Sequence, residues 1–153
     1  FQSRRHDAYD TILDQWRQQD RIYPCACSRK ELQAHDGRHP RQCRQSPDWN
    51  QASPFALRFR TPARQGTWPD RLLGKQDYRL QGEPDDFIVR RKEGYYAYHL
   101  AVVLDDIDQG INAIVRGQDL LGLTPFHLLL YEALDAPVPS YLHVPLVYNH
   151  SGQ

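Results

Sequence analysis

Three cysteines near the N-terminus are the residues whose type and spacing first suggest chemistry. Cys25 and Cys27 flank a single residue, and Cys43 closes the same segment. In a reducing cytosol, clustered thiols favour metal binding over a disulfide. A structural zinc ion takes four ligands in a tetrahedron, so a fourth ligand must come from nearby, and the candidates are His39 and His35. The alternative is three unrelated buried thiols.

A second chemical feature is an arginine that follows a short apolar run. Residues 113–115 can form a buried strand, and Arg116 stands where this strand would end, before Gly117. In open α/β sheets, the carboxyl ends of parallel strands carry ligand contacts. A guanidinium binds a carboxylate through two parallel hydrogen bonds, so Arg116 suits an amino acid with an acidic side chain. The alternative is an arginine that only extends from a strand end into water.

Two helices are expected on either side of Cys25 and Cys27, the first of them with only a packing role. The first covers residues 3–20, because one helical face is apolar while the other is charged. The apolar face is formed by Tyr9, Ile12, Leu13 and Trp16. Ser28 and Glu31 have the spacing of a capping box, which predicts a short helix directly after Cys27.

The chain that follows the cysteines should be largely exposed. Residues 55–60 alternate apolar with basic or small side chains and predict a half-exposed strand. On this strand Arg58 and Arg60 are expected to face solvent, or alternatively to contact a nucleic acid. Residues 61–83 contain two prolines and three glycines and should form loops and short strands. Within them Trp68 is expected to pack under a loop rather than to stack on a base.

The C-terminal half has the order of elements that a parallel sheet needs. Residues 87–91 and 142–147 are expected strands, while periodicity leaves 98–106 open between helix and strand. Thr124 is expected as an N-cap, with Pro125 at the first helical position. The buried face of that helix is expected to consist of Phe126, Leu129, Leu130 and Ala133. Strand, helix and strand in this order form a βαβ unit and predict a parallel sheet.

Composition limits the class of protein. The chain has 153 residues, 40% of them hydrophobic and 25% charged, which allows one ordinary core with a small subdomain and excludes a disordered chain. The formal net charge is +0, so a nucleic-acid partner would have to meet a local basic patch. No apolar run approaches the ~20 residues of a membrane span, and no secretory signal precedes the first helix. We therefore expect a cytoplasmic protein without membrane contact.

The stretch from Phe87 to Leu134 contains a series of short motifs, which in order are Arg90-Arg91, Gly94, Tyr98-His99-Leu100-Ala101, Asp105-Asp106, Ile114-Val115-Arg116-Gly117 and Thr124-Pro125. In their order and spacing, these motifs resemble the second half of the catalytic fold of glutamyl-type class I aminoacyl-tRNA synthetases. The resemblance implies an α/β fold that is part of a Rossmann-like parallel sheet and carries a small zinc-binding insert. It also makes residues 98–106 a helix.

The resemblance implies ligand-binding roles but no catalytic side chain. Tyr98 and Arg116 match the family residues that bind glutamate, although Tyr98 could also be an ordinary core residue. Pro145 and Leu146 match the strand whose backbone borders the adenine of ATP. The Asp105-Asp106 pair is expected to have a structural or acceptor-end role, because activation by ATP depends mostly on positioning and electrostatics.

Within this family, the cysteine spacing resembles the glutamyl-queuosine tRNA(Asp) synthetases. Their metal site is Cys-x-Cys, then a tyrosine, then a third cysteine, and His39 stands in the place of the tyrosine. The resemblance thus implies a structural Zn²⁺ held by Cys25, Cys27, His39 and Cys43. Imidazole is a better zinc ligand than phenol, so the departure should strengthen the site. Ordinary glutamyl-tRNA synthetases with a zinc knuckle have a longer gap before the closing ligands.

The resemblance implies a reaction in two steps. Glutamate and ATP, with Mg²⁺, form glutamyl-adenylate and pyrophosphate, and glutamate then passes to a hydroxyl of queuosine in the anticodon of tRNA(Asp). The expected enzyme is a cytoplasmic monomer. One alternative is an ordinary glutamyl-tRNA synthetase, which has a helical anticodon-binding domain. Another is a non-catalytic, zinc-stabilised module that binds tRNA.

The two ends of the sequence suggest a fragment. The chain contains no methionine and begins at Phe1, and it has no match to the family's N-terminal nucleotide signature. Residues 149–153 resemble the approach to the lysine-rich catalytic loop. We expect an internal fragment that is inactive alone, with a helix of the catalytic fold at 1–21. The zinc-binding insert with its connecting strands is expected at 22–86, and the second half of the nucleotide-binding catalytic fold at 87–153.

Overall fold

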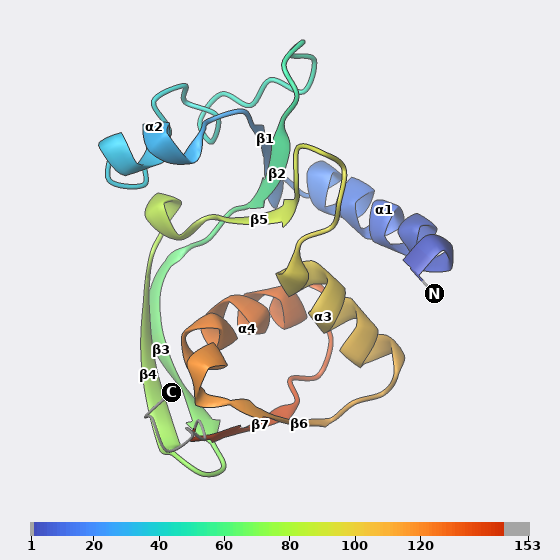
Figure 1. The fold of residues 1–153 in the computed structure, drawn as a ribbon, viewed down its shortest axis with the longest axis vertical. Helices are drawn as coiled ribbons and strands as arrows, with labels where there is room; N and C mark the ends of the chain where they lie inside the picture. The colour runs from blue at the N-terminus through green and yellow to red at the C-terminus, as the bar shows by residue number, and fades with distance from the viewer. Residues whose placement is uncertain (1, 146–153) are drawn as a thin grey trace, which may run out of the picture. The chain divides into compact units, whose positions relative to one another are not determined.

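The computed structural model describes residues 2–145, and these form two compact units (Figure 1). The first unit contains residues 2–64 and 80–101, and the second contains residues 65–79 and 102–145. Each unit has its own sheet and its own buried side chains, so each is described by itself.

Four α-helices and seven strands make up the described residues, together with two 3₁₀ helices. The helices are α1 (Gln2–Gln18), α2 (Arg29–Ala34), α3 (Tyr98–Asp108) and α4 (Thr124–Ala133), and the 3₁₀ helices are η1 (Glu83–Asp85) and η2 (Gln118–Leu123). The strands are β1 (Ile22–Cys25), β2 (Ala56–Phe59), β3 (Ala63–Asp70), β4 (Gly74–Gln81), β5 (Phe87–Arg90), β6 (Ala113–Gly117) and β7 (Ser140–Val144). No helix in this part of the chain has the length and apolar character needed to cross a membrane.

The first unit is built on a three-stranded antiparallel sheet in the order β1-β2-β5. Helix α1 buries its apolar face on this sheet, and the Trp16 ring lies edge-on to Phe59 with their centroids 5.3 Å apart. Phe59 in turn stacks on Phe87 at 5.4 Å. Tyr9 and Leu13 are buried as well, so the helical periodicity predicted the packed face of α1 correctly.

Helix α2 begins with the expected capping box. The Ser28 hydroxyl accepts a hydrogen bond from the Glu31 backbone N–H at 3.1 Å, and the Glu31 carboxylate accepts one from the Ser28 backbone at 3.3 Å. The two bonds satisfy donors that the first turn leaves without partners. They therefore start the helix immediately after Cys27.

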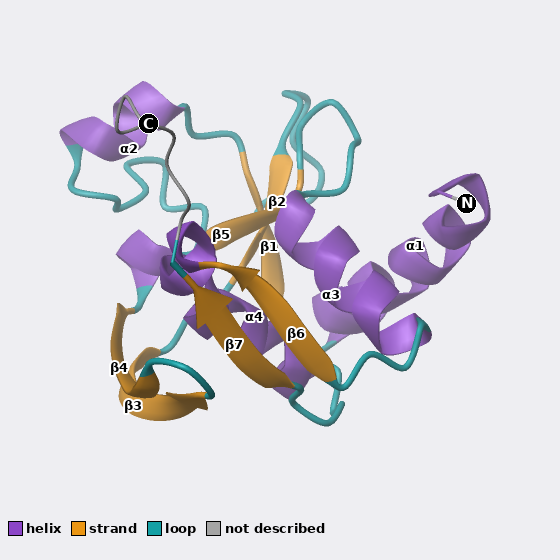
Figure 2. Ribbon diagram, turned by 60° about the horizontal axis from the view of Figure 1, so that its bottom comes forward, coloured by secondary structure: helices purple, strands orange, loops and turns teal. Residues whose placement is uncertain are grey.

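The second unit contains the predicted parallel sheet. Its strand order is β4-β3-β7-β6, and β7 runs parallel to both β3 and β6. Figure 2 shows β6 and β7 side by side with their arrows pointing the same way. Between them the chain passes through η2 and α4, which completes the βαβ unit.

Three details of the second half differ from the sequence prediction. Strand β6 was expected to be buried, yet Val115 is 67% exposed, because β6 is the last strand of its sheet among the described residues. Thr124 is not an N-cap, because η2 runs directly into α4 and removes the need for one. In α4, Leu129 and Leu130 are buried as predicted, but Phe126 and Ala133 are only partly buried.

The connecting segment 61–83 is more regular than its prolines and glycines suggested. It forms two eight-residue strands, β3 and β4, that lie next to each other in the sheet. Pro69 is accommodated near the end of β3. Strand β7 begins at Ser140, earlier than predicted, and residues 146–147 of the predicted strand lie outside the described residues.

Candidate metal and carboxylate sites

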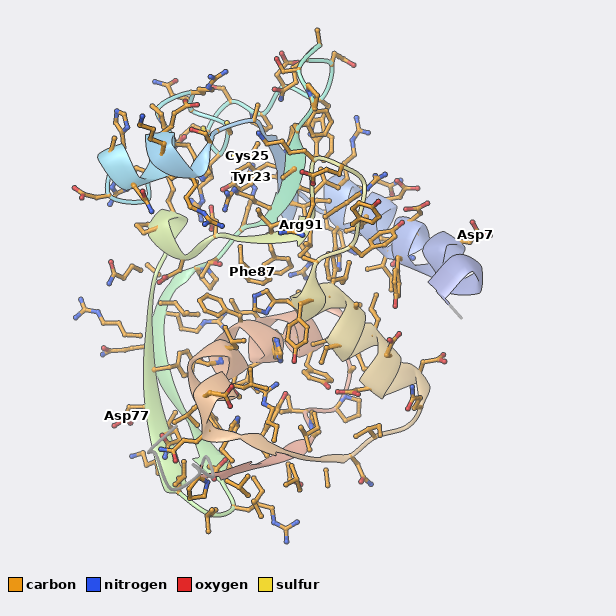
Figure 3. The ribbon with its side chains drawn as sticks, in the orientation of Figure 1. Asp7, Tyr23, Cys25, Asp77, Phe87 and Arg91 are labelled. Atoms are coloured by element: carbon orange, nitrogen blue, oxygen red, sulfur yellow. The ribbon has the colours of Figure 1, made fainter. Side chains whose placement is uncertain are left out.

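The three cysteines and His39 come together in the first unit. Cys25 ends β1, Cys27 precedes α2, and the loop after α2 brings back His39 and Cys43. All four side chains are buried, and their potential ligand atoms lie within 4.8 Å of one another. Figure 3 shows Cys25 on β1 next to Tyr23, close to the start of α2.

The distances within this group suit a metal ion. The Sγ atoms of Cys27 and Cys43 are 3.6 Å apart, and Cys25 Sγ lies 3.3 Å from His39 Nδ1. A disulfide would need a sulfur separation of about 2.05 Å, and all three thiols are free. Tetrahedral zinc with bonds of about 2.0–2.3 Å holds its ligand atoms roughly 3.5–3.8 Å apart. The group can therefore hold a metal ion with only small adjustments.

The other candidate histidine lies elsewhere. His35 is exposed, and its Nδ1 is 2.8 Å from the backbone carbonyl of Glu31. A turn follows α2, in which Gly37 adopts a φ of +83° and packs so closely that an added Cβ would lie 3.0 Å from Pro84. Only glycine combines this φ with this contact at low cost. The turn carries the chain to His39 at the cysteines.

The orientation of His39 leaves one ring nitrogen for a metal. Its Nε2 lies 2.9 Å from the Tyr23 hydroxyl, and this hydroxyl donates to Asp86 Oδ2 at 2.5 Å. Because the tyrosine proton points at the carboxylate, the tyrosine oxygen accepts from an Nε2–H group of His39. The lone pair of His39 is then on Nδ1, beside Cys25. Metal-binding histidines commonly donate their second nitrogen to such a partner.

Asp86 joins several parts of the first unit. Its fully buried carboxylate also accepts hydrogen bonds from Arg44 Nε at 2.7 Å and from the Thr61 backbone at 2.6 Å. Burial raises the pKa of Asp86, and hydrogen bonds from Tyr23, Thr61 and Arg44 oppose this without cancelling it. Sequence reasoning missed both Tyr23 and Asp86. The one available signal was a tyrosine two residues before Cys25 in a strand.

The thiols differ in how readily they lose a proton. Burial raises the pKa of Cys27 to about 12, and the neighbouring thiols Cys43 and Cys25 add to this. Burial also acts on Cys25, but a hydrogen bond that His39 Nδ1 donates when both ring nitrogens carry protons, together with the charge of Arg58, brings the pKa of Cys25 below the usual value. Cys25 is therefore the thiol best prepared to act as an anionic ligand. A bound cation would favour the thiolate form of all three.

In the second unit, Arg116 is held by a ring of buried acceptors. It lies in β6 one residue before the strand ends, and its Nε donates to His143 Nε2 at 3.0 Å. Its Nη1 lies 3.1 Å from His127 Nδ1, and its Nη2 donates to the Thr124 hydroxyl at 2.5 Å. The guanidinium also lies over the Tyr141 ring, 5.1 Å from the centroid. An arginine that merely extended into water would not have these partners, so that alternative is wrong.

Two further sets of predicted ligand-binding residues are Tyr98, expected at glutamate, and Pro145 with Leu146, expected at adenine. Tyr98 begins α3 in the first unit and is 51% exposed, so it is not a core residue. Arg116 belongs to the second unit. Pro145 is exposed directly after β7, whereas Leu146 lies outside the described residues.

Asp106 and Trp68, two other residues considered for function, are partly or fully buried. Asp106 in α3 is partly buried, which raises its pKa; the Asp105 charge adds to this, while Arg116 acts in the opposite direction. Trp68 is buried against Tyr141 with centroids 5.7 Å apart, which confirms its packing role.

The arginines of strand β2 do not form a solvated face. Arg58 donates to the Asp86 carbonyl at 3.3 Å, and both Arg58 and Arg60 are partly buried. Arg60 donates to the Arg44 carbonyl at 2.8 Å and lies over the Tyr23 ring. The prediction of solvent-facing side chains was therefore wrong, because both side chains contact residues around the cluster of Cys25, Cys27, His39 and Cys43.

The fold is shared with solved structures. A glutamate tRNA ligase from Elizabethkingia meningosepticum, solved in complex with its amino acid, superposes with a TM-score of 0.76 at 23% identity. The match covers 95% of this chain and 34% of that one. The glutamate-tRNA synthetase of Elizabethkingia anophelis has the same TM-score and identity, over 97% of this chain and 34% of its own. The described residues thus share the fold of a segment of these enzymes.

Sequence comparison identifies the family. The family described as tRNA synthetases class I (E and Q), catalytic domain, matches residues 1–153, and the chain belongs to this family. A protein of Pseudomonas syringae pv. tomato named glutamyl-Q tRNA(Asp) synthetase is 47% identical over 99% of this chain and 50% of its own length. A Pseudomonas putida protein of the same name is 43% identical over the same shares. The chain spans about half the length of the curated relatives it matches.

Replacing Asp86 tests its role as the central acceptor of the first unit. We expect Asp86→Ala to lower the free energy of unfolding of the full-length protein by about 3–5 kcal/mol, because Arg44 and the Thr61 N–H lose a buried partner. Urea denaturation measures the change. Asp77→Ala, on the exposed side of β4, is the matched control and should change stability by no more than about 0.5 kcal/mol. Equal effects of the two replacements would contradict the assignment.

Proposed function

We propose that this chain is part of an enzyme that activates glutamate with ATP and transfers it to queuosine in the anticodon of tRNA(Asp). The observation that carries this proposal is the identity of 43–47% with glutamyl-Q tRNA(Asp) synthetases over 99% of the chain. The fold and the family are consistent with it. The protein is expected to act as a cytoplasmic monomer.

Arg116 of the second unit is proposed to bind glutamate, and Tyr98 of the first unit is proposed as a glutamate-binding residue on the strength of the sequence resemblance alone. A guanidinium has five N–H donors, and Arg116 uses three of them on His143, His127 and Thr124 among the described residues. The other two remain for the carboxylate of a substrate. Tyr98 is 51% exposed, so its ring is not enclosed in the core.

ATP, with Mg²⁺, is proposed to be the second substrate, and its adenine is proposed to lie along the backbone of Pro145 and Leu146. In this adenylyl transfer the glutamate carboxylate attacks the α-phosphorus of ATP and pyrophosphate leaves, a step that depends on positioning and on stabilising charge. In this part of the chain we therefore assign binding roles and no general acid or base.

We also propose that Cys25, Cys27, His39 and Cys43 hold a structural Zn²⁺. Three buried sulfurs and one imidazole nitrogen within 4.8 Å form a donor set that zinc prefers. The ion would join β1 to the loop after α2 and would take no part in the reaction.

The first prediction concerns the reaction. The full-length protein should catalyse glutamate-dependent exchange between ATP and pyrophosphate without tRNA, and should transfer glutamate only to tRNA(Asp) that contains queuosine. Labelling with radioactive glutamate measures transfer. Exchange that needs tRNA(Glu), with charging of its 3′ end, would identify an ordinary glutamyl-tRNA synthetase instead. Absence of exchange under either condition would favour the non-catalytic tRNA-binding module.

The second prediction concerns Arg116. We expect Arg116→Ala to raise the KM for glutamate steeply, because the loss of a charge-assisted pair with two hydrogen bonds costs about 2–4 kcal/mol. Arg116→Lys should recover only part of this, since an ammonium lacks the planar fork. Arg79→Ala on β4 is the control for loss of an exposed arginine in the same unit. An unchanged glutamate dependence in Arg116→Ala would remove Arg116 from the site.

The third prediction concerns the metal. Purified wild-type protein should contain one zinc ion per chain, and His39→Ala should lose it on dialysis against a mild chelator. His35→Ala should keep its zinc, because His35 lies outside the group. Inductively coupled plasma mass spectrometry measures the zinc content. Retention of zinc by His39→Ala together with its loss from His35→Ala would reverse the assignment.

A further inference from the structure

Arg116 is the end of a chain of buried hydrogen bonds in the second unit. Its Nε donates to His143 Nε2, and His143 Nδ1 lies 2.6 Å from Asp70 Oδ1. The side chains of His143 and Asp70 are both 0% exposed. Asp70 ends β3 and His143 lies in β7, so two neighbouring parallel strands supply the partners of an arginine in β6.

The geometry determines where the His143 proton lies. Since Arg116 cannot accept a hydrogen bond, the Nε2 that faces it must carry a lone pair. The proton is then on Nδ1, where it is donated to the Asp70 carboxylate. The opposite tautomer would direct an N–H group at the Arg116 N–H and a lone pair at an anion. Nε2 also lies 3.1 Å from the Thr124 hydroxyl, which can donate to the same lone pair.

The surroundings of Asp70 require a carboxylate. Oδ2 accepts from the backbone N–H groups of Leu72 and Leu73 at 3.0 and 2.8 Å, while Oδ1 accepts from the His143 backbone at 2.9 Å as well as from its ring. Burial would raise the pKa of Asp70, but these hydrogen bonds outweigh it and lower the pKa. Both oxygens face donors only. An amide in this place would direct its NH₂ group at one of those donors.

We propose that Asp70 and His143 are positioning residues for glutamate recognition. Asp70 selects the Nδ1–H tautomer of His143, His143 thereby accepts from Arg116, and the guanidinium is held with its two remaining N–H groups toward the substrate. This inference depends on the proposed function, in which Arg116 binds glutamate. It assigns no contact between substrate and either positioning residue. Their contribution is to orient Arg116 before glutamate arrives.

The tautomer is measured first, without reference to activity. Ring ¹⁵N shifts of His143 in the ¹⁵N-histidine-labelled full-length protein should show a protonated Nδ1 and an unprotonated Nε2 at neutral pH. Asp70→Asn should move the proton to Nε2, as expected when an amide replaces a carboxylate beside a histidine. A wild-type ring protonated on Nε2, or on both nitrogens, would overturn the proposal.

Kinetics then test whether the orientation matters for glutamate. His143→Leu removes the acceptor for Arg116 and should raise the KM for glutamate about tenfold or more, with little change in kcat or in the KM for ATP. His143→Gln offers an amide oxygen near the Nε2 position and should restore most of the glutamate KM. Equal KM values for wild type and His143→Leu would overturn the positioning role, as would equal impairment of the two variants.

The two proposals can fail separately. If Arg116→Ala leaves the glutamate KM unchanged, the proposed function of Arg116 fails. If Arg116→Ala raises the KM while His143→Leu does not, only the positioning role fails. Should His143→Leu not fold, the decisive results are the glutamate KM of His143→Gln and of Asp70→Asn. We expect the first near wild type and the second raised, and the reverse order would overturn the proposal.

Discussion

The structure depends on the hydrogen bonding of two carboxylates whose side chains are 0% exposed, Asp86 in the first unit and Asp70 in the second. A carboxylate removed from water must be matched by hydrogen-bond donors or positive charge, because its desolvation costs several kcal/mol. Asp86 obtains these donors from Tyr23, Arg44 and the Thr61 backbone. Asp70 obtains them from three backbone groups and the ring of His143. Each carboxylate thereby fixes the residues around one candidate site.

The small core around Cys25, Cys27, His39 and Cys43 explains why a bound ion would stabilise this part of the first unit. Helix α2 has only six residues and buries none of them completely, so it gains little from the hydrophobic effect. The buried cluster beside it consists of Tyr23 and the three cysteines, with Leu32 packed against them. A segment with so small a core needs another source of stability, and metal coordination is one that small domains commonly use. The hydrogen bond from His39 to Tyr23 prepares the ligand orientation before any ion binds.

The sequence predicted the features that arise from local patterns. The apolar periodicity of α1, the Ser28 capping box and the βαβ order after Ala113 were all read correctly, since each depends on residues close together in the chain. The partners of the two sites were not predicted. Asp86 contacts Tyr23 across 63 positions and Asp70 contacts His143 across 73, and no spacing rule connects such residues. Thr124 was predicted wrongly for a different reason, because η2 runs directly into α4 and the hydroxyl accepts from Arg116 instead.

The arrangement around Arg116 bears on how an acidic amino acid could be distinguished from its amide. Three N–H groups of the guanidinium are directed at protein acceptors, so the two that remain have a fixed direction and spacing. One of the remaining N–H groups is on Nη1 and the other on Nη2. Two such donors can match the two oxygens of a carboxylate, whereas an amide presents one oxygen and one NH₂ group, and the latter would face a donor. An NH₂ group that faces an Arg116 N–H leaves both donors without an acceptor. In a partly buried site this raises the free energy of binding of the amide, so the amide would be strongly rejected. A mobile arginine could rotate to lessen the mismatch. The rigid acceptors on β7 and α4 prevent this, so selectivity for a carboxylate would follow as much from Asp70, His143 and Thr124 as from the arginine.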